Sequence, residues 1–113
     1  MKFNNILKVE QNCINKIYEL LYMNNIKGKI LFVTDYLVDE LYGNEVCNQI
    51  IKLGDYKKEY VNNNTIEYAM TLAENVISND IDYIIGLGGG KVLDECKYAA
   101  YVSKRVFVSI PTT

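Results

Sequence analysis

Three unbroken apolar runs do most to decide how this chain of 113 residues can fold. They span residues 29–34, 83–87 and 106–110, and each has the length of a β-strand. A strand in a parallel sheet is covered on both faces, so its sequence is apolar throughout instead of alternating. Helical patterns separate the runs, and this alternation predicts βαβ units. We therefore expect an α/β domain, a Rossmann-like parallel sheet with helices on both faces and these three strands at its centre.

Two weaker strands and a first helix are expected beside them. Residues 6–9 form a short apolar strand candidate, and the more polar residues 56–61 are expected near a sheet edge. Asn12 is expected to cap the first helix, because its side chain can accept from a free backbone N–H. The inward face of that helix follows the i, i+3, i+4, i+7 pattern, with Ile14, Ile17, Tyr18 and Leu21.

Glycines are expected to end the next two helices. A short helix over 36–42 is expected to stop at Gly43, and a helix over 44–53 at Gly54, because glycine favours the position just after a helix.

Asn64 and Glu67 resemble a capping box that opens a further helix. Its expected inward residues are Ile66, Ala69, Met70, Ala73, Val76 and Ile77. The last helix is expected over about 91–101, and Pro111 is expected to close the last strand.

Composition excludes several kinds of protein. The chain has no histidine, which removes Ser-His-Asp and Cys-His nucleophiles and histidine metal sites. A net charge of −2 gives no basic surface for nucleic acid and no polybasic membrane patch, and no apolar run reaches the roughly 20 residues of a membrane span. The odd number of widely spaced cysteines (Cys13, Cys47, Cys96) favours reduced thiols and a cytoplasmic location. One domain over residues 1–113 is expected.

The strongest chemical signal is the glycine loop Gly88, Gly89, Gly90 between a buried strand and a helix. Such glycines let the backbone approach a ligand closely, and the helix N-terminus with Lys91 supplies positive charge for a phosphate. Lysine at position 91 breaks the G-x-G-x-x-G pattern, and valine at 92 breaks the Walker A motif. The alternative is that the glycines only make a tight turn. The sequence favours phosphate binding, because one or two glycines would suffice for a turn.

Asp35 directly follows the first buried strand and is the second candidate. At a strand's carboxyl end an acid can accept hydrogen bonds from an adenosine ribose, and it would repel a 2′-phosphate, which favours NAD over NADP. The alternative is that Asp35 caps the next helix. Weaker candidates have plain structural interpretations: Asp94 and Lys97 as a surface pair, Thr112 and Thr113 as loop residues, and Cys96 as a packing residue.

Residues 82–97 and 106–113 resemble the nucleotide-binding domain of the iron-dependent alcohol dehydrogenase and dehydroquinate synthase superfamily, most of all its glycerol dehydrogenase and sn-glycerol-1-phosphate dehydrogenase branches. The resemblance implies that Gly89, Gly90 and Lys91 belong to a pyrophosphate loop and that Asp35 is the ribose acid. It further implies that Asp94 opens the helix behind the loop, close to the cofactor, and that Thr112 and Thr113 lie beside the cofactor.

The resemblance also implies a function. The chain is expected to be the NAD-binding domain, with NADP possible, of a metal-dependent polyol or glycerol-1-phosphate dehydrogenase that is a homo-oligomer. In the family, a divalent metal (zinc or iron) is held by a helical second domain that these residues do not include. The chain is therefore expected to be an N-terminal fragment, to hold no metal or catalytic residue and to be inactive alone. Two alternatives stay open: a cyclase of the dehydroquinate synthase type, and a stand-alone nucleotide-binding module. Lys91, Lys97 and the short spacing from Asp94 to Pro111 favour the dehydrogenase over the cyclase.

Overall fold

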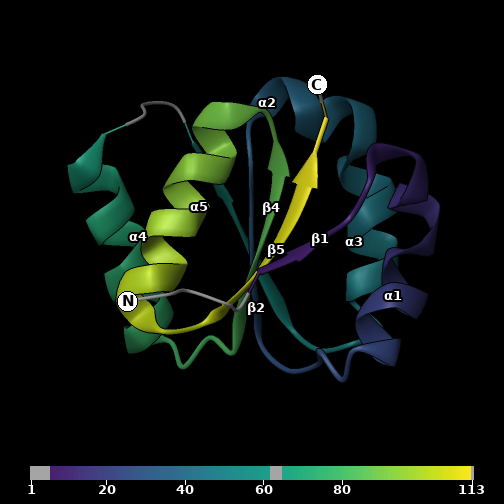
Figure 1. Cartoon of the computed structure of the whole chain (residues 1–113), viewed down its shortest axis with the longest axis horizontal. Coiled ribbons are helices and arrows are strands. Elements are labelled where there is room, and N and C mark those ends of the chain that lie inside the picture. The colour runs from purple at the N-terminus through teal and green to yellow at the C-terminus, as the bar shows by residue number, and fades with distance from the viewer. Residues whose placement is uncertain (1–5, 62–64, 113) are drawn as a thin grey trace.

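The computed structural model of the chain describes residues 6–61 and 65–112. Its centre is a sheet of parallel strands in the order β1-β5-β4-β2-β3 (Figure 1). The strands are β1 (Ile6–Lys8), β2 (Ile30–Thr34), β3 (Tyr56–Tyr60), β4 (Tyr83–Gly88) and β5 (Val106–Pro111). The expected α/β fold is confirmed: the three apolar runs form the central strands, and the polar β3 lies at an edge.

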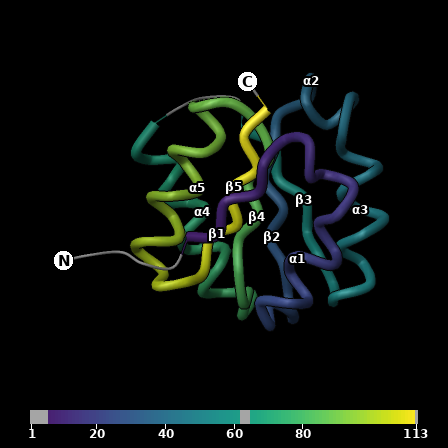
Figure 2. Tube along the Cα trace, turned by 45° about the vertical axis from the view of Figure 1, so that its right-hand side comes forward, coloured from purple at the N-terminus to yellow at the C-terminus, as the bar shows by residue number. Residues whose placement is uncertain are grey.

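Helices cover both faces of the sheet (Figures 1 and 2). On one face lie η1 (Gln11–Lys16, a 3-10 helix), α1 (Ile17–Met23) and α3 (Asn44–Ile50), and on the other lie α4 (Ile66–Ser78) and α5 (Gly90–Ser103). In β2, Ile30 and Phe32 pack under the first layer, whereas Leu31 and Val33 pack under the second. Both sets are fully buried, which explains why the run lacks polar alternation.

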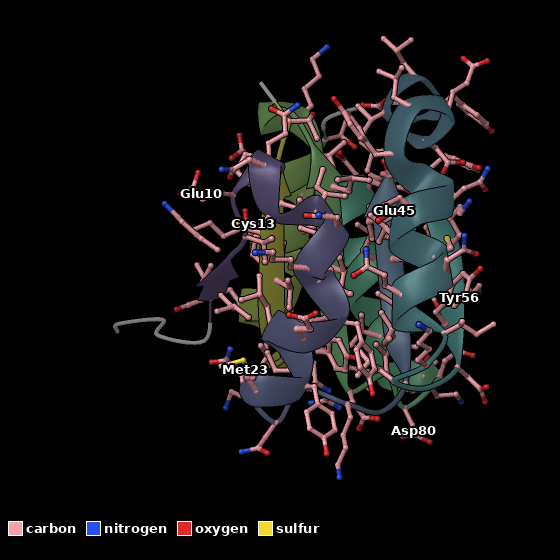
Figure 3. All side chains as sticks on the ribbon, turned by 90° about the vertical axis from the view of Figure 1, so that its right-hand side faces the viewer. Glu10, Cys13, Met23, Glu45, Tyr56 and Asp80 are labelled. Carbon is pink, nitrogen blue, oxygen red and sulfur yellow. The ribbon has the colours of Figure 1, made fainter. Side chains whose placement is uncertain are left out.

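The N-terminal helix begins differently from the expectation that Asn12 caps it. The helical segment starts as the 3-10 helix η1 after Glu10, whose side chain makes no capping bond, and Asn12 lies within η1. The N–H of Cys13 donates to the carbonyl of Glu10, so the chain turns into helix before Asn12 could act as a cap. Figure 3 shows η1 and α1 beside α3, from Glu10 to Met23. Ile14, Ile17 and Leu21 are buried as expected, and Tyr18 is half-buried.

Gly43 does not stop a helix, which corrects the expectation. The chain runs on from α2 (Tyr36–Val38) through η2 (Asp39–Gly43, a π-helix) into α3, and Gly43 has helical angles of φ −59° and ψ −44°. A Cβ at Gly43 would collide with the carboxylate of Asp39. The glycine therefore provides space and does not end the helix.

The expectation that Gly54 ends a helix is also wrong. α3 ends at Ile50, a turn follows, and the positive-φ glycines in the described residues are Gly28 and Gly88. A Cβ at Gly54 would collide with the carbonyl of Gly28, so this glycine serves a close approach of two loops.

The start and inward face of α4 differ from expectation as well. Thr65 is the cap, because its hydroxyl accepts from the N–H of Tyr68 at 3.1 Å, and Asn64 lies outside the described residues. Ala69, Ala73 and Val76 are buried as expected, together with Leu72. Ile66, Met70 and Ile77 are instead 68%, 41% and 54% exposed. The inward stripe is centred on Leu72, so these three residues lie on its flank.

Candidate functional site

The order of the strands predicts a crevice for a ligand at the carboxyl ends of the strands. From β2 the chain passes to its neighbour β3, whereas from β4 it passes to β5 on the opposite side. In open α/β sheets, ligands bind where the connections diverge in this way, at the carboxyl ends of the strands. That point lies between the ends of β2 and β4, at the top of Figure 1, where α2 and the start of α5 lie. Asp35 follows β2 there, and the glycine loop connects the end of β4 to the start of α5.

A buried hydrogen bond joins the two strands just below this crevice. The hydroxyl of Thr34 donates to the carbonyl of Leu87 at 2.8 Å, and Thr34 is fully buried. Sequence reasoning overlooked Thr34, although a hydroxyl at the end of an otherwise apolar strand was a visible signal. The bond holds the ends of β2 and β4 together beneath any ligand.

Two glycines, one in the loop and one in the strand before it, are explained by packing within the chain. Gly88 has φ +154°, and a Cβ there would lie 3.0 Å from Cγ2 of Val92. At Gly86, inside β4, a Cβ would lie 2.9 Å from both the sulfur of Cys96 and the ring of Phe107. Gly86 therefore lets α5 and β5 pack closely, and the burial of Cys96 confirms its expected packing role.

Gly90 has no such explanation. It is the first residue of α5, and a Cβ built there meets no atom within 4 Å apart from its chain neighbours and the adjacent helix backbone. Glycine in a helix is less favourable than alanine by roughly 0.5–1 kcal/mol, so folding alone gives no reason for it. The empty space lies outside the protein, where a ligand could approach the backbone.

The first turn of α5 presents free donors to that space. Gly89, in an extended conformation, precedes the helix and gives no side-chain cap. Across residues 6–61 and 65–112, no acceptor receives the N–H groups of Gly90, Lys91 or Val92. Lys91 is exposed and forms no ion pair with any residue in those ranges. These N–H groups, the helix dipole and the lysine together suit a phosphate, so the residues fit the pyrophosphate of a dinucleotide.

Asp35 acts as a helix cap. Its Oδ1 accepts from the N–H of Val38 at 2.8 Å, which is the structural alternative considered for this residue. Oδ2 receives no hydrogen bond from the described part of the chain. The cap fixes the side chain at the crevice, and the second oxygen stays available to a hydroxyl group. Capping and ribose binding are therefore compatible.

The other predicted site residues have less direct contact with the glycine loop or lie farther from it. The N–H of Thr112 donates to the carbonyl of Gly88 at 3.1 Å, which brings the end of β5 beside the glycine loop. Thr113 lies outside the described residues. Asp94 is exposed and lines a hollow of about 160 Å³ with Thr65 and Tyr98. It lies one helical turn beyond Gly90, on the surface between α4 and α5.

Glu95 is a buried acid in the same hollow that sequence reasoning did not single out. It is 2% exposed, and its Oε2 has no hydrogen-bond partner among the described residues. Burial raises the pKa of Glu95, and the charge of Asp94 adds to this, while the N–H of Thr65 acts in the opposite direction. The sequence around Glu95 does not distinguish it from an exposed residue, because charged residues on the solvent side of a helix occur at similar spacings.

A second group of polar side chains joins the segment that follows Asp35 to the edge strand β3. Lys58 on β3 donates to both carboxylate oxygens of Asp39 at 3.0 and 3.1 Å, and the hydroxyl of Tyr60 also donates to Asp39. Burial alone would lower the pKa of Lys58, but the hydrogen bond and charge of Asp39 outweigh it and raise that pKa. The rings of Tyr36 and Tyr60 stack at 4.1 Å. These contacts attach the segment that follows Asp35 to the edge strand.

In the described residues, no helix is long and apolar enough to cross a membrane. The cysteines Cys13, Cys47 and Cys96 are all free thiols.

Comparison with known proteins identifies the family. The model of the iron-containing alcohol dehydrogenases matches residues 8–113. The chain belongs to this family. It is similar to the glycerol-1-phosphate dehydrogenase [NAD(P)+] of Metallosphaera sedula, with 28% identity over 92% of the chain and 30% of the relative. It is similar also to that of Methanococcus aeolicus, with 32% identity over 93% of the chain and 28% of the relative.

The fold of this family member has relatives among solved structures. The glycerol dehydrogenase of Schizosaccharomyces pombe superposes with a TM-score of 0.73 at 17% identity, over 94% of the chain and 27% of that protein. The sequence relatives confirm the expected resemblance to the glycerol-1-phosphate dehydrogenases, and the glycerol dehydrogenase shares the fold. The chain spans less than a third of the length of the relatives that it matches.

Proposed function

We propose that this chain provides the NAD(P)-binding part of a metal-dependent dehydrogenase that acts on a small polyol or on glycerol-1-phosphate. Membership of the family and the names of the two curated relatives support the dehydrogenase class over the cyclase. The observation that carries the cofactor assignment is Gly90: it is a glycine with open space beside it, next to unpaired N–H groups at the crevice. A turn alone would account for Gly88 but not for Gly90.

Each residue of the site has a separate task in this proposal. Gly88 makes the bend, and the N–H groups of the first turn of α5 bind the pyrophosphate together with Lys91. The free oxygen of Asp35 accepts from the adenosine ribose, and its charge disfavours a 2′-phosphate. Asp94, Thr112 and Thr113 are proposed to lie beside the cofactor.

When bound, the nicotinamide exchanges a hydride with the substrate, and in full-length members a divalent metal, zinc or iron, polarises the substrate oxygen. The described residues orient the cofactor and supply no catalytic group. The proposal includes a cytoplasmic location, which the free thiols support, and a homo-oligomeric full-length enzyme.

Titration of the purified chain with NADH tests the assignment, with Gly90→Ala as the decisive variant. Alanine fits the fold at this position, so the variant should unfold at the same temperature or a higher one. We expect its affinity for NADH to fall about tenfold or more, because the added methyl group occupies the space through which the pyrophosphate approaches.

Asn48→Ala is the matched control, since Asn48 is an exposed helix residue on α3 and alanine also improves helix propensity there. It should leave the affinity unchanged. Equal affinity of the wild type and Gly90→Ala, or no binding of NADH by the wild type at about 1 mM, would contradict the proposal.

A further inference from the structure

The segment that follows Asp35 has little apolar packing to hold it in place. Residues 36–42 lie beyond the carboxyl end of β2, at the top of Figure 2, and none of them is buried. Val38 and Tyr42 pack against the core but stay half-buried. The other large apolar side chains of the segment are exposed, namely Tyr36, Leu37 and Leu41. The position of the segment therefore depends largely on polar contacts.

Asp39 makes the strongest of these contacts. Its carboxylate accepts from Nζ of Lys58 at 3.0 and 3.1 Å and from the hydroxyl of Tyr60, and both partners lie on the edge strand β3. The side chain of Asp39 is 16% exposed, so salt and water screen this ion pair less than a surface pair. The N–H of Asp39 donates to the carbonyl of Asp35 at 2.9 Å. Asp39 thus links the edge strand to the backbone of Asp35.

The helix around Asp39 departs from regular α-helix in two ways. Residues 39–43 form the π-helix η2, a rare form that occurs mostly as a single turn within α-helices and frequently at functional sites. Gly43 lies inside the continuous helical segment, where glycine is less favourable than alanine. A Cβ at Gly43 would collide with the carboxylate of Asp39. The glycine is therefore explained by the carboxylate that it accommodates.

The same contacts bear on the side chain of Asp35. Its Oδ1 accepts from the N–H of Val38, the residue directly before Asp39, and Oδ2 receives no hydrogen bond from the described part of the chain. The ring of Tyr36 stacks on that of Tyr60, so the first turn contacts β3 on both sides of Val38. A binding group discriminates well only when the residues around it hold it in place. Movement of this turn would move the free oxygen of Asp35 with it.

We propose that Asp39 is a positioning residue for recognition of the cofactor's 2′ position, and that Lys58 and Tyr60 hold it in place. This anchor, Asp39 with Lys58 and Tyr60, keeps the free oxygen of Asp35 where it accepts from the 2′-hydroxyl of NADH and repels the 2′-phosphate of NADPH. Without the anchor, the turn can move away from a 2′-phosphate, so discrimination falls. The inference rests on the proposed function, because it requires Asp35 to face the adenosine ribose.

Titration of the purified chain with NADH and with NADPH tests the proposal. The main variant, Asp39→Ala with Lys58→Met, removes the ion pair of the anchor without changing the net charge. Its matched control is Glu59→Gln with Lys57→Met, which removes the exposed pair at 3.6 Å on the same strand, also without changing the net charge. The preference for NADH over NADPH should fall about threefold or more in the main variant and stay unchanged in the control.

Tyr60→Phe keeps the proposal testable if the main variant does not fold. It removes one donor to Asp39, keeps the ring that stacks on Tyr36 and leaves every charge in place. The preference for NADH should fall in this variant too, by less than in the main variant. Tyr56→Phe is its control, because Tyr56 lies at the other end of β3.

Hydrogen exchange of the free chain gives a second measurement that needs no dinucleotide. The amide of Val38 is bonded to Oδ1 of Asp35, so it reports whether the cap is held. It should exchange about tenfold faster or more in the main variant. The amide of Ala73, in the middle of α4, reports any general loss of stability and provides the reference.

The outcomes separate this inference from the proposed function. A wild-type chain that binds neither dinucleotide would contradict both. A preference for NADH that falls in Asp35→Asn but not in the main variant would overturn the role of Asp39 alone. Equal falls in the main variant and its control would do the same. Faster exchange at Val38 with an unchanged preference would show that Asp39 only stabilises the turn, which also overturns the proposal.

Discussion

The hydroxyl of Thr34 donates to the carbonyl of Leu87 at 2.8 Å, which joins β2 to β4 immediately before the glycine loop. The two residues lie far apart in the sequence, yet both stand at the crevice where the connections of the sheet diverge. The donor is fully buried, so water cannot replace it.

Thr34→Val should therefore reduce stability by about 1–2 kcal/mol, because it keeps the shape of the side chain and removes the hydrogen bond to a buried carbonyl. Thr34→Ser retains the hydroxyl and should keep this bond. Urea unfolding of both variants measures the difference. A valine variant as stable as the wild type would show that the bond contributes nothing.

Asp35→Asn separates the two roles of this residue. Asparagine is as good a cap as aspartate, so the bond to the N–H of Val38 should remain and stability should change little. The negative charge is lost, so the preference for NADH over NADPH should fall by about tenfold, or ~1.4 kcal/mol. Titration with both dinucleotides measures this ratio. An unchanged ratio would show that Asp35 acts only as a helix cap.

Glu95 gives the stability of the chain a dependence on pH. Burial raises the pKa of Glu95 above its ordinary value of 4.5, so the folded state binds the proton more tightly than the unfolded state. The stabilisation from this group is complete below the unfolded pKa and is lost as the pH rises through the folded pKa.

Glu95→Gln should accordingly be more stable than the wild type at pH 8, by on the order of 1–3 kcal/mol, and similar to it at pH 4. Thermal unfolding from pH 4 to pH 8 measures the difference, with the exposed Glu40→Gln as a control. A difference that is constant over this range would contradict the assignment.

Gly43→Ala should destabilise the fold by about 1–3 kcal/mol, because the new Cβ would collide with the carboxylate of Asp39. The displaced carboxylate also loses its contacts with Lys58 and Tyr60. In the background of Asp39→Ala the same change should cost much less, so the two substitutions should be strongly non-additive. Additive losses, measured by urea unfolding, would locate the strain elsewhere.

The purified chain should produce no NADH from NAD⁺ and glycerol-1-phosphate, even with added zinc or iron. It has no histidine, and its described residues hold no group of three His, Cys, Asp or Glu side chains that could bind a metal. Absorbance at the NADH band measures this, with a full-length relative as the positive control. Metal-dependent turnover by the chain would contradict the expectation that the metal is held by a second domain that these residues do not include.

Sequence patterns sufficed for the sheet because strands buried on both faces leave an unambiguous apolar run, as in residues 30–34. They also located the crevice, since residues after β2 and β4 must meet at one edge. They failed where one residue type has two uses. Gly43 provides space inside a continuous helical segment, and a terminating glycine has the same local pattern. Ile77 is apolar and is expected to face the core, but it is 54% exposed. A neighbouring stripe of α4, centred on Leu72, packs against the sheet instead.

The pairing of β1 with β5 has a consequence for how the chain folds. Ile6 pairs with Phe107, so the first strand finds its place only after the residues up to β5 are available. Contacts this distant in sequence slow folding, because the entropy of closing a long loop is lost before the contact forms. During synthesis, β2, β3 and β4 can assemble on their own, while the N-terminal strand waits unpaired and open to chaperones or to aggregation.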